Sequence, residues 1–184
     1  MFQLPNKLPS EDLSVGVNAM MMIIAEAENV FGHRDTSYKI NPTIIYGDHS
    51  PRASGMVING EKICIVHLSN GSKAGWPCFL FEMAHEAVHI LNPRNDPASY
   101  LEEGIAVWFS QIMCKKYGFR PNAPTGKYRR ALELIKSLPE EPPIVVSKIR
   151  ELYPNLTDLT QEELLACYSS ISALTAKRLV AKMV

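Results

Sequence analysis

The sequence predicts an α+β fold, in which a small, mainly antiparallel sheet is accompanied by a larger number of helices. Two segments rich in Ile and Val, Ile40–Tyr46 and Lys62–Leu68, are bounded by Gly, Asn and Pro and predict strands. Asn59-Gly60 is the preferred two-residue turn of a β-hairpin, so a short strand over Met56–Ile58 is expected before it. Much of the remaining chain has the spacing of apolar residues that is typical of helices.

Two helices are predicted in the first half of the chain. Ser10 is a suitable N-cap for the first, which is expected to continue until Gly32 ends it. The second covers Cys78–Leu91, where no residue breaks a helix, and it follows Pro77, which suits a first helical turn.

A third helix is expected directly after the second, joined to it by a tight turn. Asp96-Pro97 offers an N-cap followed by proline at the first helical position, and Gly118 would end the helix. A helical C-terminal portion is then expected over about residues 122–184, without an independent linker, so that residues 1–184 form one domain. Its expected helices are Tyr128–Leu138, Val146–Leu152, Gln161–Tyr168 and Ala173–Met183.

The composition is that of a globular protein and narrows the expected partners. Of the 184 residues, 46% are hydrophobic and 21% are charged, and the formal net charge is zero. This balance gives no reason to expect nucleic-acid or membrane partners. Met1–Ser10 lacks the features of a secretory signal, and the cysteines are too scattered for a disulfide framework, so a reducing cytoplasm is the expected location. The cysteines are Cys64, Cys78, Cys114 and Cys167.

The pentapeptide His85-Glu86-Ala87-Val88-His89 lies within the second predicted helix and carries the strongest chemical signal. Residues four apart stand on one helix face, so His85 and His89 can both bind one metal ion. Glu86 lies roughly 100° around the helix, where its carboxylate can reach a metal-bound water as a general base. The competing interpretation is a surface helix with two solvated histidines.

A catalytic zinc ion (Zn2+) requires a third protein ligand. Glu102 and Glu103 are the nearest downstream carboxylates, and the turn between the two helices would fold one of them over the first site. Helical periodicity does not choose between them. Taken without the upstream motif, they would be read as acidic residues placed near the positive end of the helix dipole.

The two motifs together resemble the gluzincin metallopeptidases over about 30 residues, from Phe79 to Phe109. The second motif, Leu101-Glu102-Glu103-Gly104-Ile105-Ala106, is similar to a segment in which the ligand Glu directly precedes Gly. The resemblance implies a zincin-like fold, Glu103 as the third zinc ligand, and close helix packing at Gly104. Val107 departs from the thermolysin branch, where an acidic residue at that position orients a zinc-bound His.

The resemblance also implies how a substrate would bind. A strand, here Lys62–Leu68, would run beside the cleft, and an extended peptide would pair with its edge. A tyrosine or histidine beyond the third ligand would stabilise the oxyanion, and the position in the sequence leaves Tyr117, Tyr128 and Tyr168 as alternatives.

The expected function is therefore that of a zinc-dependent metallopeptidase with a peptide or protein substrate. Zinc held by His85, His89 and Glu103 would lower the pKa of bound water toward about 7, and Glu86 would take its proton. Two alternatives remain. One is a regulatory protease that cleaves a specific protein such as a repressor, and the other is a zinc-binding module without turnover.

Overall fold

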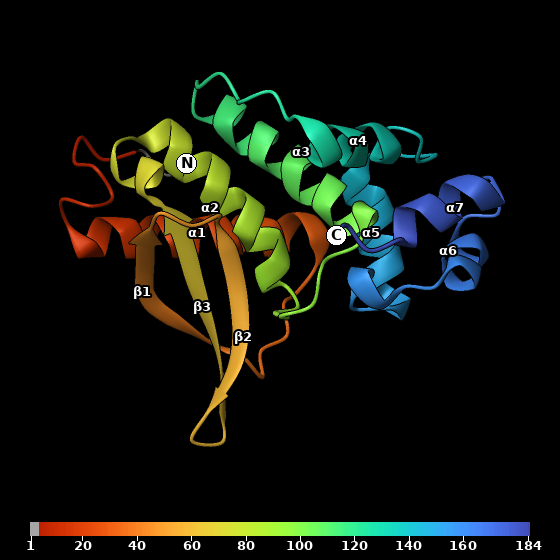
Figure 1. Cartoon of the computed structure of the whole chain (residues 1–184), viewed down its shortest axis with the longest axis horizontal. Helices are drawn as coiled ribbons and strands as arrows, with labels where there is room; N and C mark the ends of the chain where they lie inside the picture. The colour runs from red at the N-terminus through yellow and green to blue at the C-terminus, as the bar shows by residue number, and fades with distance from the viewer. Residues whose placement is uncertain (1–3) are drawn as a thin grey trace.

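The computed structural model describes residues 4–184, and within them the chain folds as an α+β protein with one small sheet (Figure 1). The strands are β1 (Lys39–Gly47), β2 (Arg52–Ile58) and β3 (Glu61–Ser69). The helices are α1 (Leu13–Phe31), α2 (Trp76–Ile90), α3 (Tyr100–Lys116), α4 (Gly126–Ile135), α5 (Pro142–Leu152), α6 (Gln161–Cys167) and α7 (Ala173–Val180), with 3-10 turns η1 (Asn70–Lys73) and η2 (Leu156–Asp158). The segment Met1–Ser10 was expected to lack a secretory signal. Its first three residues lie outside the described residues.

The sheet is mixed, with β3 between β1 and β2. β3 pairs in parallel with β1, where Ile44 is opposite Val66, and antiparallel with β2, where Ala53 is opposite Val66. The prediction of a mainly antiparallel sheet is therefore wrong for the β1–β3 pairing. Because β3 lies between β1 and β2, these two strands are about 10 Å apart, twice the strand spacing. The loop of residues 48–51 therefore crosses the end of β3 to join them.

This topology also corrects the expected substrate edge. Lys62–Leu68 lies in β3, the central strand, whose backbone is paired on both sides. Within residues 4–184, β2 pairs with β3 alone, so β2 has one free edge. That edge faces the cleft described below.

The β2–β3 hairpin forms where the sequence predicts it. Ile58 is opposite Glu61, which leaves a two-residue turn at Asn59 and Gly60 with φ values of 51° and 82°. Positive φ at both positions defines a type I′ turn, which matches the twist of the strands it joins. β2 begins at Arg52, four residues before the expected start.

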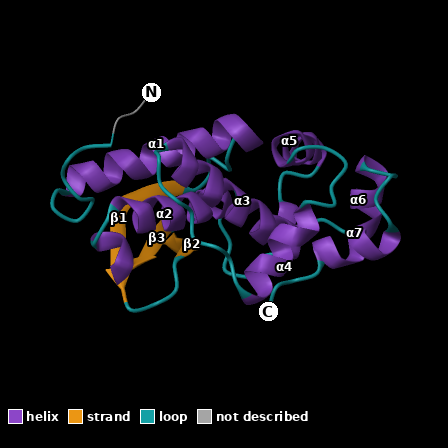
Figure 2. Cartoon of the chain, turned by 90° about the horizontal axis from the view of Figure 1, so that it is seen from above, coloured by secondary structure: helices purple, strands orange, loops and turns teal. Residues whose placement is uncertain are grey.

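Helices cover one face of the sheet, and α2 lies over the strands, between the sheet and the other helices (Figure 2). Alternate residues of β3, namely Cys64, Val66 and Leu68, are fully buried on this face. α2 contacts α1 on one side, α3 on another, and the strands β2 and β3 beneath it. The motif-bearing helix is thus held from several directions.

Two helix starts differ from the prediction. α1 is capped by Asp12, whose side chain accepts a hydrogen bond from the Ser14 backbone, and not by Ser10. α3 is capped by Ser99, which accepts from the Glu102 backbone, and not by Asp96, whose carboxylate pairs with Arg94. The segment between α2 and α3 is correspondingly longer than a tight turn.

The C-terminal helices agree broadly with the expected positions. α5 starts earlier than expected, at Pro142, because proline fits the first turn of a helix. Buried apolar residues of α4 to α7 pack in the same cluster as those of α1, α2 and the sheet. Among residues 4–184, no helix combines the length and the apolar character that a membrane crossing requires.

Gly104 is the point at which α3 packs closely against α4. A Cβ atom built on Gly104 would lie 2.6 Å from the backbone oxygen of Ala131 and 2.6 Å from Cγ2 of Ile135. The Ala131 backbone is part of a helix and cannot move away as the end of a side chain can. A side chain at position 104 would therefore push α4 away from α3.

We expect Gly104→Ala to lower the free energy of unfolding by about 1–3 kcal/mol, the usual cost of forcing extra atoms into a packed interior. Gly75→Ala is the matched control, because a Cβ at Gly75 would meet only Pro77 Cδ at 3.6 Å, an ordinary contact. Urea unfolding of both variants measures the difference. Equal stability of the two variants would contradict this account of the α3–α4 contact.

Candidate metal centre

α2 carries two histidines on one face at the edge of its packed surface. The helix buries Phe79, Leu80 and Met83 completely, so its orientation is fixed by apolar contacts. His85 and His89, one turn apart, are only partly buried, and their ring centroids are 5.1 Å apart. The rings therefore project from a rigid helix toward a common space.

A hydrogen-bond network at Glu82 fixes the middle of α2 against the end of β3. Its carboxylate accepts from the Ser69 backbone at 2.9 Å and from the Ser69 and Ser72 hydroxyls at 2.5 and 2.6 Å. Glu82 is one helical turn before His85 and Glu86. This contact links the motif helix to the central strand, and no pattern in the sequence indicated it.

α3 brings Glu103 to the two histidines. Glu103 Oε2 lies 3.1 Å from His85 Nε2 and 3.9 Å from His89 Nε2. One ligand atom from each of His85, His89 and Glu103 lies within 4.8 Å of the other two. Two imidazole nitrogens and one carboxylate oxygen are a usual donor set for catalytic zinc. The three residues therefore fit a divalent metal ion of this type.

The charges around His89 also favour a cation. Burial by itself would lower the pKa of His89, but the hydrogen bond and charge of Glu102, together with the charges of Glu103 and Glu86, raise it to about 10. For Glu103, burial would raise the pKa, but His85 and His89 outweigh it and lower the pKa. A group of carboxylates that stabilises an imidazolium so strongly would also stabilise a bound metal cation.

Glu86 is the most deeply buried carboxylate of the group, with 1% of its surface exposed. Burial raises its pKa, while the neighbouring histidines oppose the shift. Within the described residues its Oε2 has no hydrogen-bond partner. A buried polar atom without a partner is costly, so an acceptor here is expected to serve a water molecule or a ligand.

Glu102 and Glu103, which the periodicity did not distinguish, occupy different positions. Glu103 faces the Nε2 atoms of both histidines, whereas Glu102 Oε1 lies 2.7 Å from Nδ1 of His89. Glu103 thus belongs to the converging group, and Glu102 contacts the far side of one ring. No pattern in the sequence indicated the contact between Glu102 and His89.

Two adjoining cavities open around the histidines and Glu86. One, of about 310 Å³, is bordered by residues 52–54 of β2 and by residues 92 and 94–98 of the segment that connects α2 to α3. The other, of about 350 Å³, is bordered by Phe81, Val107 and the loop of residues 122–125. His85 and Glu86 line both, so the two cavities form the halves of one cleft.

Of the three tyrosines proposed from the sequence, Tyr128 lines this cleft. It borders both cavities, and its ring packs edge-on against His85 with centroids 5.8 Å apart. Burial and the charges of Glu103 and Glu86 raise its pKa, which keeps its hydroxyl protonated. Tyr117 donates to the sulfur of Met22, and Tyr168 donates to Glu140, so these two hydroxyls are engaged elsewhere.

Comparisons with protein-family models, with curated proteins and with solved structures found no match to this chain. The arrangement of His85, Glu86, His89 and Glu103 therefore carries the functional argument.

We expect the purified protein to bind about one zinc ion per chain and to lose it in both His85→Ala and Glu103→Ala, because each variant removes one converging donor. His33→Ala is the matched control, since His33 is exposed and lies outside the group. Elemental analysis after zinc reconstitution measures the result. If both His85→Ala and Glu103→Ala retained zinc, the metal would have to bind at another site.

Proposed function

We propose that this protein is a zinc-dependent metallopeptidase of the gluzincin type, with a zincin-like arrangement of the site. The observation that carries the proposal is the convergence of His85, His89 and Glu103 beside the buried carboxylate of Glu86. Two histidines one turn apart on a helix, followed by a carboxylate from the next helix, are the donor pattern of such enzymes.

The residues of the chain divide the chemistry among them. Zinc held by His85, His89 and Glu103 would supply a Lewis acid that polarises a peptide carbonyl and makes water more acidic. Glu86, whose Oε2 is free to accept a proton, takes one from the attacking water and returns it to the leaving amine. Burial raises the pKa of Glu86, which suits a group that must both take and release a proton.

Tyr128 is positioned to stabilise the oxyanion. Its ring lies against His85 at the junction of the two cavities, where a scissile carbonyl would be placed. A protonated phenol there donates a hydrogen bond to the developing negative charge.

The edge of β2 that does not pair with β3 offers a place for an extended substrate beside residues 52–54. The carbonyl of Gly55 accepts a hydrogen bond from Asn95, so the backbone groups of Gly55 point away from β3. Backbone groups two residues apart in an antiparallel strand point to the same side, so those of Ala53 face the cleft. A peptide added along this edge would pass Glu86.

The alternatives of a repressor-directed regulatory protease and of a zinc module without turnover differ in their behaviour toward peptides. A zinc module would bind metal without cleaving any peptide. A regulatory protease would cleave one folded or flexible partner and few members of a peptide library.

We expect Glu86→Gln to retain zinc and to lower the rate of peptide cleavage by about 10²–10⁴-fold, the usual contribution of a general base. Cleavage of a peptide library is followed by mass spectrometry, and zinc content is measured on the same sample. Gln has nearly the same shape as Glu, so folding is preserved. Unchanged cleavage with zinc retained would remove Glu86 from the mechanism, and absence of cleavage in the wild type would favour the alternatives.

We expect Tyr128→Phe to lower kcat about 10²–10³-fold while zinc content and fold stay intact, because one oxyanion donor is lost. Tyr117→Phe and Tyr168→Phe are matched controls, since both hydroxyls donate outside the cleft. Steady-state kinetics on one cleaved peptide compares the three variants. A loss of activity shared by the controls would indicate a general effect on folding.

A further inference from the structure

Glu102 lies behind His89 on the side opposite to the converging donors. Its Oε1 is 2.7 Å from His89 Nδ1, and the residue is 8% exposed. His89 Nε2 faces Glu103 instead, at 3.9 Å. The two nitrogens of one ring are thus each directed at a different carboxylate.

This arrangement fixes which nitrogen of His89 keeps its hydrogen when the ring is neutral, the form that binds a metal ion. A carboxylate can only accept hydrogen bonds, so the hydrogen between Glu102 and His89 is on Nδ1 of the imidazole. In a neutral ring the other nitrogen, Nε2, then carries the lone pair. That lone pair is directed toward the space shared with His85 and Glu103, as a metal ligand requires.

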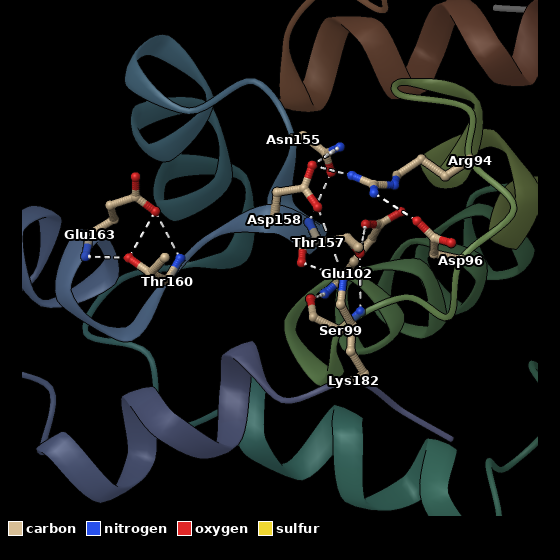
Figure 3. A network of polar contacts seen from close by, with 10 residues as sticks. All are labelled: Arg94, Asp96, Ser99, Glu102, Asn155, Thr157, Asp158, Thr160, Glu163 and Lys182. Atoms are coloured by element: carbon tan, nitrogen blue, oxygen red, sulfur yellow. Dashed lines mark hydrogen bonds and ion pairs between the residues drawn. The ribbon is translucent and has the colours of Figure 1, made fainter.

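Thr157 of η2 holds Glu102 in place (Figure 3). Its hydroxyl accepts a hydrogen bond from the Ser99 backbone at 3.0 Å. The single hydroxyl proton is therefore free for Glu102 Oε2, to which Thr157 donates. Glu102 thus has one oxygen on His89 and the other on a residue of the C-terminal helical portion.

Thr157 is itself fixed from both sides. Its backbone N–H donates to Asn155 Oδ1 at 3.0 Å, and its carbonyl accepts from Lys182 Nζ at 2.8 Å. The neighbouring Asp158 pairs with Arg94, which lies between α2 and α3 (Figure 3). These contacts fix the position of the turn, and with it the position of the Thr157 hydroxyl relative to Glu102.

We propose that Glu102 and Thr157 form a positioning unit, in which Thr157 holds Glu102 and Glu102 orients His89 for metal binding. This inference rests on the metal site of the proposed function. Neither residue contacts the metal or the substrate in this role. They act through His89, by fixing its tautomer and ring orientation and by increasing its basicity.

The proposal is tested by the zinc affinity of Glu102→Gln and Thr157→Val, measured by competition with a chromophoric chelator. Loss of an orienting partner of a metal-binding histidine weakens metal binding about 10–100-fold, and we expect this range for both variants. Val has nearly the shape of Thr but lacks the hydroxyl. The absorption spectrum of the cobalt(II)-substituted protein gives a second readout, which should change in both variants because the ligand geometry changes.

Two further variants separate positioning from a general loss of structure. Thr157→Ser keeps the hydroxyl and should bind zinc within about threefold of the wild type. Asp158→Asn weakens the ion pairs of the same turn but keeps both hydrogen bonds of the Thr157 hydroxyl, so its loss of zinc affinity should be clearly smaller than that of Thr157→Val. Thermal unfolding of all variants without metal controls for folding, and if Thr157→Val does not fold, Glu102→Gln and Thr157→Ser decide the question.

Several results would overturn the proposal. Wild-type affinity and spectrum in Glu102→Gln would remove Glu102 from the positioning of His89. An equal loss of zinc affinity in Asp158→Asn and Thr157→Val would show that the turn as a whole, and not the hydroxyl, supports the site. Absence of zinc binding by the wild type would instead overturn the proposed function, and this inference with it.

Discussion

The structure depends on the burial of two imidazoles and three carboxylates where α2 meets α3. His85, Glu86, His89, Glu102 and Glu103 are largely removed from water, and isolated charges in such a place would be unfavourable by several kcal/mol each. Each carboxylate is therefore placed beside an imidazole or a hydrogen-bond donor, apart from one free oxygen. The strands, the capped start of α3 and the C-terminal turn are arranged so that these contacts can form.

The elements that the sequence predicts well are those determined by neighbouring residues. The Asn59-Gly60 hairpin forms as expected because positive φ values suit these two residues, and Gly32 ends α1 for the same local reason. The parallel pairing of β1 with β3 could not be predicted in this way, because the composition of a short strand does not determine which strand it pairs with. The first residues of β2 were not predicted as a strand, because residues 52–55 include Arg52 and Gly55 and no β-branched or aromatic residue.

The same division holds for the candidate site. His85 and His89 follow from the four-residue spacing on one helix, and this spacing could be recognised without a structure. The separate positions of Glu102 and Glu103 could not be derived in this way, since they depend on the angle between two helices. The contact of Glu102 with Thr157 joins residues 55 positions apart and leaves no periodic signal. The start of α3 was misplaced because Asp96-Pro97 has the local features of a cap, while Asp96 is engaged by Arg94.

The attachment of the C-terminal portion to α3 has a consequence for biosynthesis. Residues 98–100 are held by backbone hydrogen bonds to residues 181–183, and Glu102 accepts a hydrogen bond from the hydroxyl of Thr157. At a translation rate of about 5–20 residues per second, the 55 positions between Glu102 and Thr157 take roughly 3–11 s to make. During synthesis, His89 and Glu102 are therefore made before Thr157 is available to contact Glu102. The contact between Glu102 and Thr157 can form only after the segment that contains Thr157 has left the ribosome.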